Sequence, residues 1–285
     1  MAQTVKIISD STCDLSKDLL EKYDIAILPL HILLGETEYR DGVDITPEEI
    51  FRWSDENKTT PKTSAPSMTE AMEVMKPFLD EGREIICFSI SDSMSTSGNV
   101  MRLAAEELEA SDKVTVINSA NLSTGIGLQV IQAALLSAEG KTRAQITAAI
   151  EEIRPRVRAS FTVDTLTYLY RGGRCNAVAA LAGTMLKLHR RIVVEDGAMD
   201  ASKKYRGKLS SVILSYTKDM EDDLKNAVPD RVFITHSGCD REIVESVRSY
   251  LESLGIFNEI LETRAGGVIS SHCGPGTLGV LFIEK

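Results

Sequence analysis

Short runs of β-branched and other apolar residues alternate with longer segments of helical periodicity along the first half of the chain. Strands are predicted at residues 5–9, 25–30, 85–90 and 114–118. Helices are predicted at residues 16–23, 47–53, 67–81, 98–109, 123–138 and 143–154. This alternation is typical of strand–helix–strand units around a mainly parallel sheet, so the first half is predicted to form an α/β domain.

The second half of the chain shows a less regular pattern. Strands are expected near residues 160–163, 191–195, 231–236, 258–263 and 279–283, and a turn at Asp196-Gly197. Helices are expected at residues 165–169, 177–186, 210–226 and 242–254. We interpret this half as a second α/β domain with a mixed sheet.

The two halves meet near Arg154 and Pro155. Proline disfavours helical geometry in the residue before it, and a new strand-like run begins at Ala159. We therefore place the boundary near Val157, which gives domains at residues 1–157 and 158–285. A length of 285 residues agrees with two domains, since a single domain usually has roughly 100 to 200 residues.

The composition excludes several classes of protein. No stretch approaches the roughly 20 apolar residues of a membrane helix, so we expect no stable membrane insertion. The N-terminus lacks an export signal and the five cysteines are scattered, which favours a cytoplasmic protein. A formal net charge of −10 disfavours nucleic acid as a partner. The four histidines are far apart and no H-E-x-x-H motif occurs, so no metal site is predicted.

Polar loops that follow predicted strands are the expected places for a ligand in an open α/β sheet. Asp10-Ser11-Thr12 is one such loop, although a helix cap and a tight turn would also explain it. In a second loop, Ser67 and Glu70 form a capping box for the next helix. That box leaves Thr63 and Ser64 unexplained, and their hydroxyls are candidates for ligand contact.

The hydroxyl-rich loop from Ser91 to Ser97 opens a predicted helix and is the third candidate. A helix N-terminus favours an anion, so Ser95 and Ser97 are candidate ligand residues, with capping as the alternative. The chain has neither the G-x-x-x-x-G-K-[ST] loop nor G-x-G-x-x-G, which indicates a singly charged anion such as a carboxylate rather than a nucleotide. The loop from Asn118 to Gly127 has the same strand–loop–helix form.

Two glycine-rich segments of the second half complete the candidates. Arg171-Gly172-Gly173-Arg174 can turn sharply and place a guanidinium in a cleft, or can form a surface turn. His272 is predicted to lie in a glycine-rich loop, which favours a functional role over a place in the core. Ser95 and His272 could in principle belong to a catalytic triad, but the G-x-S-x-G elbow is absent.

Five motifs occur in one order along essentially the whole chain. They are Asp10 to Leu15, Thr63 to Ser67, Ser91 to Gly98, Phe161 to Arg174, and His272 to Gly279. In this order they resemble the DegV family of bacterial fatty-acid-binding proteins. The resemblance implies a long-chain fatty acid buried between an N-terminal and a C-terminal α/β domain. It also implies that hydroxyls of Thr63 and Ser95 meet the carboxylate, with Arg174 and His272 nearby.

The same resemblance implies a carrier rather than an enzyme. Family members present the carboxylate to a separate ATP-dependent fatty acid kinase, which makes acyl phosphate for phospholipid synthesis; no cofactor is needed besides the bound fatty acid. The alternatives are an acyl hydrolase or a small-molecule kinase, and a regulator that senses the lipid. Two departures from the family occur. Met94-Ser95-Thr96-Ser97 stands where Leu-Ser-Gly-Thr is usual, and the common Lys-Pro pair is replaced around His189-Arg190.

Overall fold

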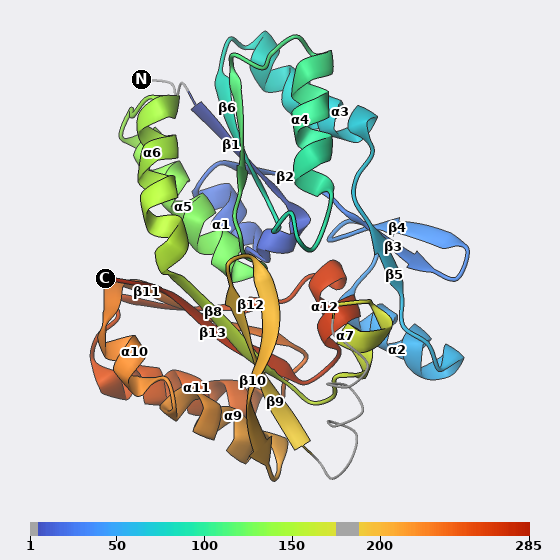
Figure 1. Cartoon of the computed structure of the whole chain (residues 1–285), viewed down its shortest axis with the longest axis vertical. Coiled ribbons are helices and arrows are strands. Elements are labelled where there is room, and N and C mark those ends of the chain that lie inside the picture. The colour runs from blue at the N-terminus through green and yellow to red at the C-terminus, as the bar shows by residue number, and fades with distance from the viewer. Residues whose placement is uncertain (1–4, 175–187) are drawn as a thin grey trace.

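A computed structural model describes residues 5–174 and 188–285 of the chain (Figure 1). The helix expected at residues 177–186 lies outside the described residues. The described chain contains two larger sheets with helices packed on them, and a small third sheet beside the first. The α/β fold predicted from the sequence is confirmed, with a parallel sheet in the first half and a mixed sheet in the second.

The first sheet has four strands, all parallel, in the order β2-β1-β6-β7. Its strands are β1 (Val5–Asp10), β2 (Ile25–Leu28), β6 (Glu84–Ser89) and β7 (Val114–Asn118). Apolar side chains occupy both faces of the sheet. Helices α3 (Met68–Asp80) and α4 (Ser97–Glu107) cover one face, and α1 (Lys17–Lys22), α5 (Thr124–Ala138) and α6 (Arg143–Ile153) cover the other.

A three-stranded antiparallel sheet, in the order β4-β3-β5, was not predicted from the sequence. It consists of β3 (His31–Leu34), β4 (Thr37–Arg40) and β5 (Lys62–Ser64). These strands are short and partly polar, so they lack the apolar run that identifies a buried strand. Along the chain, helix α2 (Pro47–Asn57) connects β4 to β5. Its N-terminus has a capping box of Thr46 and Glu49.

The six-stranded sheet of the second half is mixed, in the order β10-β9-β8-β13-β11-β12. Only β11 and β12 pair in parallel; every other pair in this sheet is antiparallel. Its strands are β8 (Val157–Val163), β9 (Leu188–Glu195), β10 (Ala198–Arg206), β11 (Ala227–Ser237), β12 (Glu259–Arg264) and β13 (Thr277–Glu284). Helices α9 (Leu209–Lys218), α10 (Glu221–Lys225) and α11 (Arg241–Leu254) pack on one face.

Helix α5 lies between the two larger sheets (Figure 1). Its apolar residues share one core with strands of both sheets, including Phe88 of β6 and Phe161 of β8. A Cβ atom on Gly127 of this helix would lie 2.8 Å from the side chain of Leu15, so glycine permits the close packing. The shared core joins the two halves of the chain.

Three details of the second half correct the sequence predictions. Strand β10 was missed, and the expected helix at residues 210–226 is divided into α9 and α10. The segment around His272, predicted as a glycine-rich loop, is a helix, α12 (Gly267–Cys273), and it packs against the short helix α7 (Thr167–Arg171). Carboxylates distant in the sequence accept hydrogen bonds from the first N–H groups at α12, so the local pattern could not reveal this helix.

Candidate functional site

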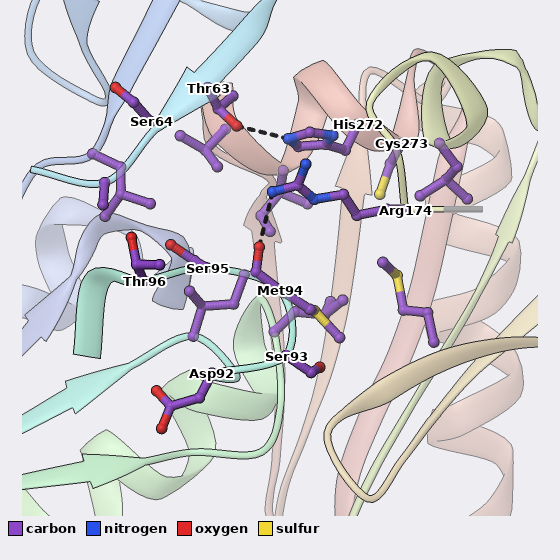
Figure 2. A pocket seen from close by; sticks show the side chains of 18 residues that line it. Thr63, Ser64, Asp92, Ser93, Met94, Ser95, Thr96, Arg174, His272 and Cys273 are labelled. Carbon is purple, nitrogen blue, oxygen red and sulfur yellow. Dashed lines mark hydrogen bonds between the residues drawn. The ribbon is translucent and has the colours of Figure 1, made fainter. Parts of the chain in front are cut away.

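One cavity of about 440 Å³ brings together most of the residues predicted to contact a ligand. It lies where the loops after β6 and β7 meet β5, α7 and α12, at the carboxyl ends of parallel strands. Its polar lining consists of Thr63, Ser64, Asp92, Ser93, Ser95, Thr96, Arg174 and His272 (Figure 2). Of the predicted ligand residues, only Ser97 is missing from its wall.

The remaining wall of the cavity is mostly apolar. It is formed by Leu30, Ala65, Ile90, Met94, Leu122, Leu169, Met199, Val268, Ile269 and Cys273. Sequence reasoning missed this part, because the residues come from separate segments and each looks like an ordinary core position. Ile90 and Met94 could have indicated the apolar wall, because they are two apolar residues among the serines of the hydroxyl-rich loop. A volume of this size with such a wall is typical of a small-molecule site.

Thr63 and His272 connect the two halves of the chain across the cavity. The Thr63 Oγ1 atom lies 2.8 Å from Nε2 of His272 (Figure 2). Burial, followed by the nearby positive charge of Arg174, lowers the pKa of His272 to about 4, so the imidazole is neutral at physiological pH. A Cβ atom on Gly172 would lie 2.2 Å from Nδ1, so glycine is needed for the ring to pack there.

The surroundings of the imidazole favour one tautomer. Nδ1 of His272 is buried and has no hydrogen-bond partner within residues 5–174 and 188–285. An orphaned N–H donor is rarer in proteins than an underused acceptor, so the proton is expected on Nε2. Nε2 then donates to Thr63 Oγ1, and the hydroxyl proton of Thr63 is free to be donated to a ligand.

Arg174 supplies an unneutralised positive charge at the cavity. Its guanidinium donates to the carbonyl oxygens of Met94 at 2.8 Å and Gly172 at 2.6 Å (Figure 2). No carboxylate in the described part of the chain forms an ion pair with it. Asp92 is the acidic member of the lining, and it pairs with Arg102 at 3.0 Å. The uncompensated charge of the site is therefore positive, which favours an anion.

The hydroxyls of the loop after β6 have different roles. Ser95 is half-buried, and its Oγ accepts a hydrogen bond from the N–H of Ser97, so its own proton is available. Ser97 is fully buried, and its hydroxyl donates to Asp10 Oδ2 at 2.7 Å instead of facing the cavity. Asp10 also accepts from the N–H of Ile90, so it anchors the start of this loop.

Ser64 lines the cavity from β5, but its hydroxyl points away from Arg174 and His272 (Figure 2). It is exposed, whereas the neighbouring Thr63 is half-buried. The alternation of side chains along a strand explains this difference, because successive residues face opposite sides. Thr63, Ser95, Arg174 and His272 thus form the polar end of the cavity.

The geometry does not assemble a catalytic nucleophile. The Nε2 atom of His272 bonds Thr63, so Ser95 has no base in its hydrogen-bond network. Among the residues that the structure describes, no group of three or more His, Cys, Asp or Glu side chains is placed to hold a metal ion. None of the described helices combines the length and apolar character needed to cross a membrane.

A larger cavity of about 780 Å³ lies beside the end of α6 and the strands β8 and β9. It contains none of the predicted ligand residues. Charged side chains in its wall are paired in part, such as Arg154 with Glu151 at 2.7 Å and Arg158 with Glu284. The smaller cavity, with its apolar wall and an arginine that has no carboxylate partner among the described residues, is the better candidate site.

The chain is similar to known proteins over nearly its whole length. The family model described as an uncharacterised protein of the DegV family matches residues 4–285. A DegV domain-containing protein of Clostridium perfringens is 32% identical over 281 residues, with 99% of each chain covered.

Solved structures with a similar fold include a DegV family protein from Thermus thermophilus whose structure concerns fatty acid binding. It is 31% identical, has a TM-score of 0.90, and the match covers 99% of this chain and 100% of that one. A stearic-acid-binding protein from Eubacterium ventriosum is 32% identical with a TM-score of 0.84, covering 99% and 98% of the two chains.

Proposed function

The chain belongs to the DegV family, and from this we propose that it binds a long-chain fatty acid in the cavity between its two larger sheets. The carboxylate would lie at Thr63, Ser95, Arg174 and His272, with the tail along the apolar wall. The observation that carries the proposal is the combination of this wall with the guanidinium of Arg174, which forms no ion pair within residues 5–174 and 188–285. Binding of stearic acid by the Eubacterium ventriosum relative supports it.

The two ends of such a ligand would contribute differently. At about 0.8 kcal/mol per buried methylene, a 16-carbon tail gains on the order of 10 kcal/mol before the costs of association. The carboxylate gains less, because it gives up its hydration when it is buried. The donors at Thr63, Ser95 and Arg174 offset that loss, so they fix the orientation of the ligand and contribute less to its affinity than the tail does.

We infer further that the protein is a cytoplasmic carrier and not itself a catalyst. On this account it presents the carboxylate to a separate ATP-dependent fatty acid kinase. A carboxylate oxygen would attack the γ-phosphorus of ATP there, releasing ADP and leaving an acyl phosphate. The exposure of Arg174 and the partial exposure of Ser95 support this, since they place the polar end near the surface. The sequence has no phosphate-binding lysine loop, which agrees with the proposal that a separate kinase binds the ATP.

Lipid extraction of the purified protein followed by mass spectrometry tests the proposal. We expect a co-purified long-chain fatty acid, or stoichiometric binding of palmitate or oleate to lipid-free protein. A protein that is empty and binds neither acid would contradict it. Hydrolysis of acyl esters or ATP by the isolated protein, lost in Ser95→Ala, would instead indicate an enzyme.

A further inference from the structure

Helix α12 forms part of the cavity wall, and its placement determines the geometry of the polar end. It contributes Val268, Ile269, His272 and Cys273 to the wall. Any shift of the helix would change the 2.8 Å separation between His272 and Thr63. A helix this short is marginal on its own, because too few backbone hydrogen bonds offset the cost of nucleation. Other parts of the molecule must therefore hold it.

Two buried carboxylates from the first half of the chain bind the start of α12. The N–H of Gly266 donates to Asp14 Oδ1 at 2.8 Å, and the N–H of Gly267 donates to Asp41 Oδ1 at 2.7 Å. These N–H groups have no partner within a helix, so the carboxylates satisfy donors that would otherwise be buried unpaired.

The carboxylates are themselves fixed by hydroxyl groups. Ser11 Oγ donates to Asp41 Oδ2 at 2.8 Å and accepts from the N–H of Leu30 at 3.1 Å. Ser123 at the start of α5 donates to Asp14. Asp41 is thus connected to the segment before β3, and Asp14 to α5. A buried network in which the donors find acceptors is rigid.

The two glycines at the start of α12 lie where the packing leaves no room for a side chain. A Cβ atom on Gly267 would lie 2.5 Å from Ile32 Cδ1 and 2.9 Å from Ile50 Cδ1. One on Gly266 would lie 3.1 Å from Asp14 Oδ1. The backbone therefore packs directly on the first half of the chain, and the hydrogen bonds to the carboxylates can form at ordinary lengths.

We propose that Asp14 and Asp41 are positioning residues that hold α12, and with it His272, in the place where Thr63 and a bound carboxylate need it. Neither aspartate lines the cavity, so each acts through the helix. The inference rests on the proposed function for the role of the ligand, but the positioning of His272 is a property of the ligand-free protein.

Nitrogen NMR of the histidine side chains tests the inference without ligand. The chain has four histidines, and the signal of His272 is identified by its loss in His272→Gln. In Asp41→Ala we expect the His272 signal to shift and the pKa of its imidazole to rise from about 4 toward 6.5. Oleate affinity should fall about tenfold. Asp41→Asn keeps one acceptor for Gly267 and should show a smaller change in the same direction.

Ser137→Ala is the matched control, because it also removes a buried hydrogen bond, from Ser137 Oγ to the carbonyl of Val5, away from α12. The control should leave the His272 signal in place. An unchanged His272 signal in folded Asp41→Ala and Asp14→Ala would overturn the inference, as would an equal shift in Ser137→Ala. If Asp41→Ala does not fold, Asp41→Asn and Ser11→Ala decide the same question.

The two proposals fail in different ways. Wild-type protein that binds no fatty acid contradicts the proposed function, while the ligand-free NMR comparison still decides whether the aspartates position His272. If wild-type protein binds oleate and the His272 NMR signal is the same in Asp14→Ala and Asp41→Ala as in wild type, only the positioning role is contradicted.

Discussion

Both ends of helix α12 are largely buried, but the polar groups at the two ends differ in how completely they are hydrogen-bonded. At the start of the helix, the carboxylates of Asp14 and Asp41 accept the N–H groups and hydroxyls that face them. At the other end, within the residues that the structure describes, His272 Nδ1 has no hydrogen-bond partner and Arg174 forms no ion pair with a carboxylate. A buried network in which every polar group has a hydrogen-bond partner stabilises the fold. A network with free donors and an unpaired charge is suited to binding a ligand.

The largest effect expected from this difference between the two ends is on the pH dependence of the unfolding free energy. Burial raises the pKa of Asp41 from 3.8 to about 6, so folded protein keeps a proton that the unfolded chain loses. The unfolding free energy should therefore fall by about 3 kcal/mol as pH rises through that window. Burial lowers the pKa of His272 from 6.5 to about 4, so rising pH should raise the unfolding free energy by a similar amount.

The two opposing contributions can be separated by substitution and urea unfolding. Relative to wild type, Asp41→Asn should make stability increase more steeply with pH between about 4 and 6, because the contribution of His272 then acts without that of Asp41. His272→Gln should make it decrease over the same range. Identical pH profiles for all three proteins would show that the two ends of α12 do not titrate as described.

Arg174→Met removes the positive charge at the polar end of the cavity while keeping much of the side-chain length. The loss of a charged hydrogen bond of about 1.5 to 3 kcal/mol should weaken oleate binding roughly 10- to 100-fold. Fluorescence or calorimetric titration measures the change. Arg241→Met is the control, since Arg241 is exposed on α11 and pairs only with Glu245, and its affinity should match wild type.

Thr63→Val keeps the shape of the side chain and removes the hydroxyl that bonds His272 and that we propose donates to the ligand. We expect binding about tenfold weaker, because one donor to the carboxylate is lost. The His272 NMR signal should also move, since its Nε2 loses the partner at 2.8 Å. An affinity within twofold of wild type would place the carboxylate elsewhere.

Ser95→Ala and Ser64→Ala compare two serines that line the same cavity. Ser95 offers its proton at the polar end, so its loss should weaken binding by up to about tenfold. The Ser64 hydroxyl points away from that end, so its removal should change affinity less than about twofold. Equal effects of the two substitutions would show that the cavity does not distinguish these hydroxyls.

The sequence predicted the regular parts of the fold and most of the polar residues that line the candidate cavity. Apolar strands separated by amphipathic helices predict the parallel sheet, and hydroxyls after strands point to Ser95. The small sheet carrying Thr63 and helix α12 were missed, because both depend on contacts between distant residues. Ser97 looked equivalent to Ser95, yet the turn at the start of α4 directs its hydroxyl to Asp10.

The apolar wall could not be found from sequence for a similar reason. Leu30, Leu122, Leu169 and Ile269 come from different segments and are indistinguishable from ordinary core residues until the chain is folded. The polar end has the clearer local signal, since hydroxyls and an arginine beside glycines are uncommon in a core.

The central claim is that the polar end of the cavity receives the carboxylate of a ligand whose tail lies along the apolar wall. Calorimetric titration with oleate and with oleyl alcohol tests it most directly, because the two share a tail and differ in the charge of the head group. We predict that wild type binds oleate at least about tenfold more tightly, and that Arg174→Met abolishes most of the difference. Equal affinity of wild type for the acid and the alcohol would contradict the claim.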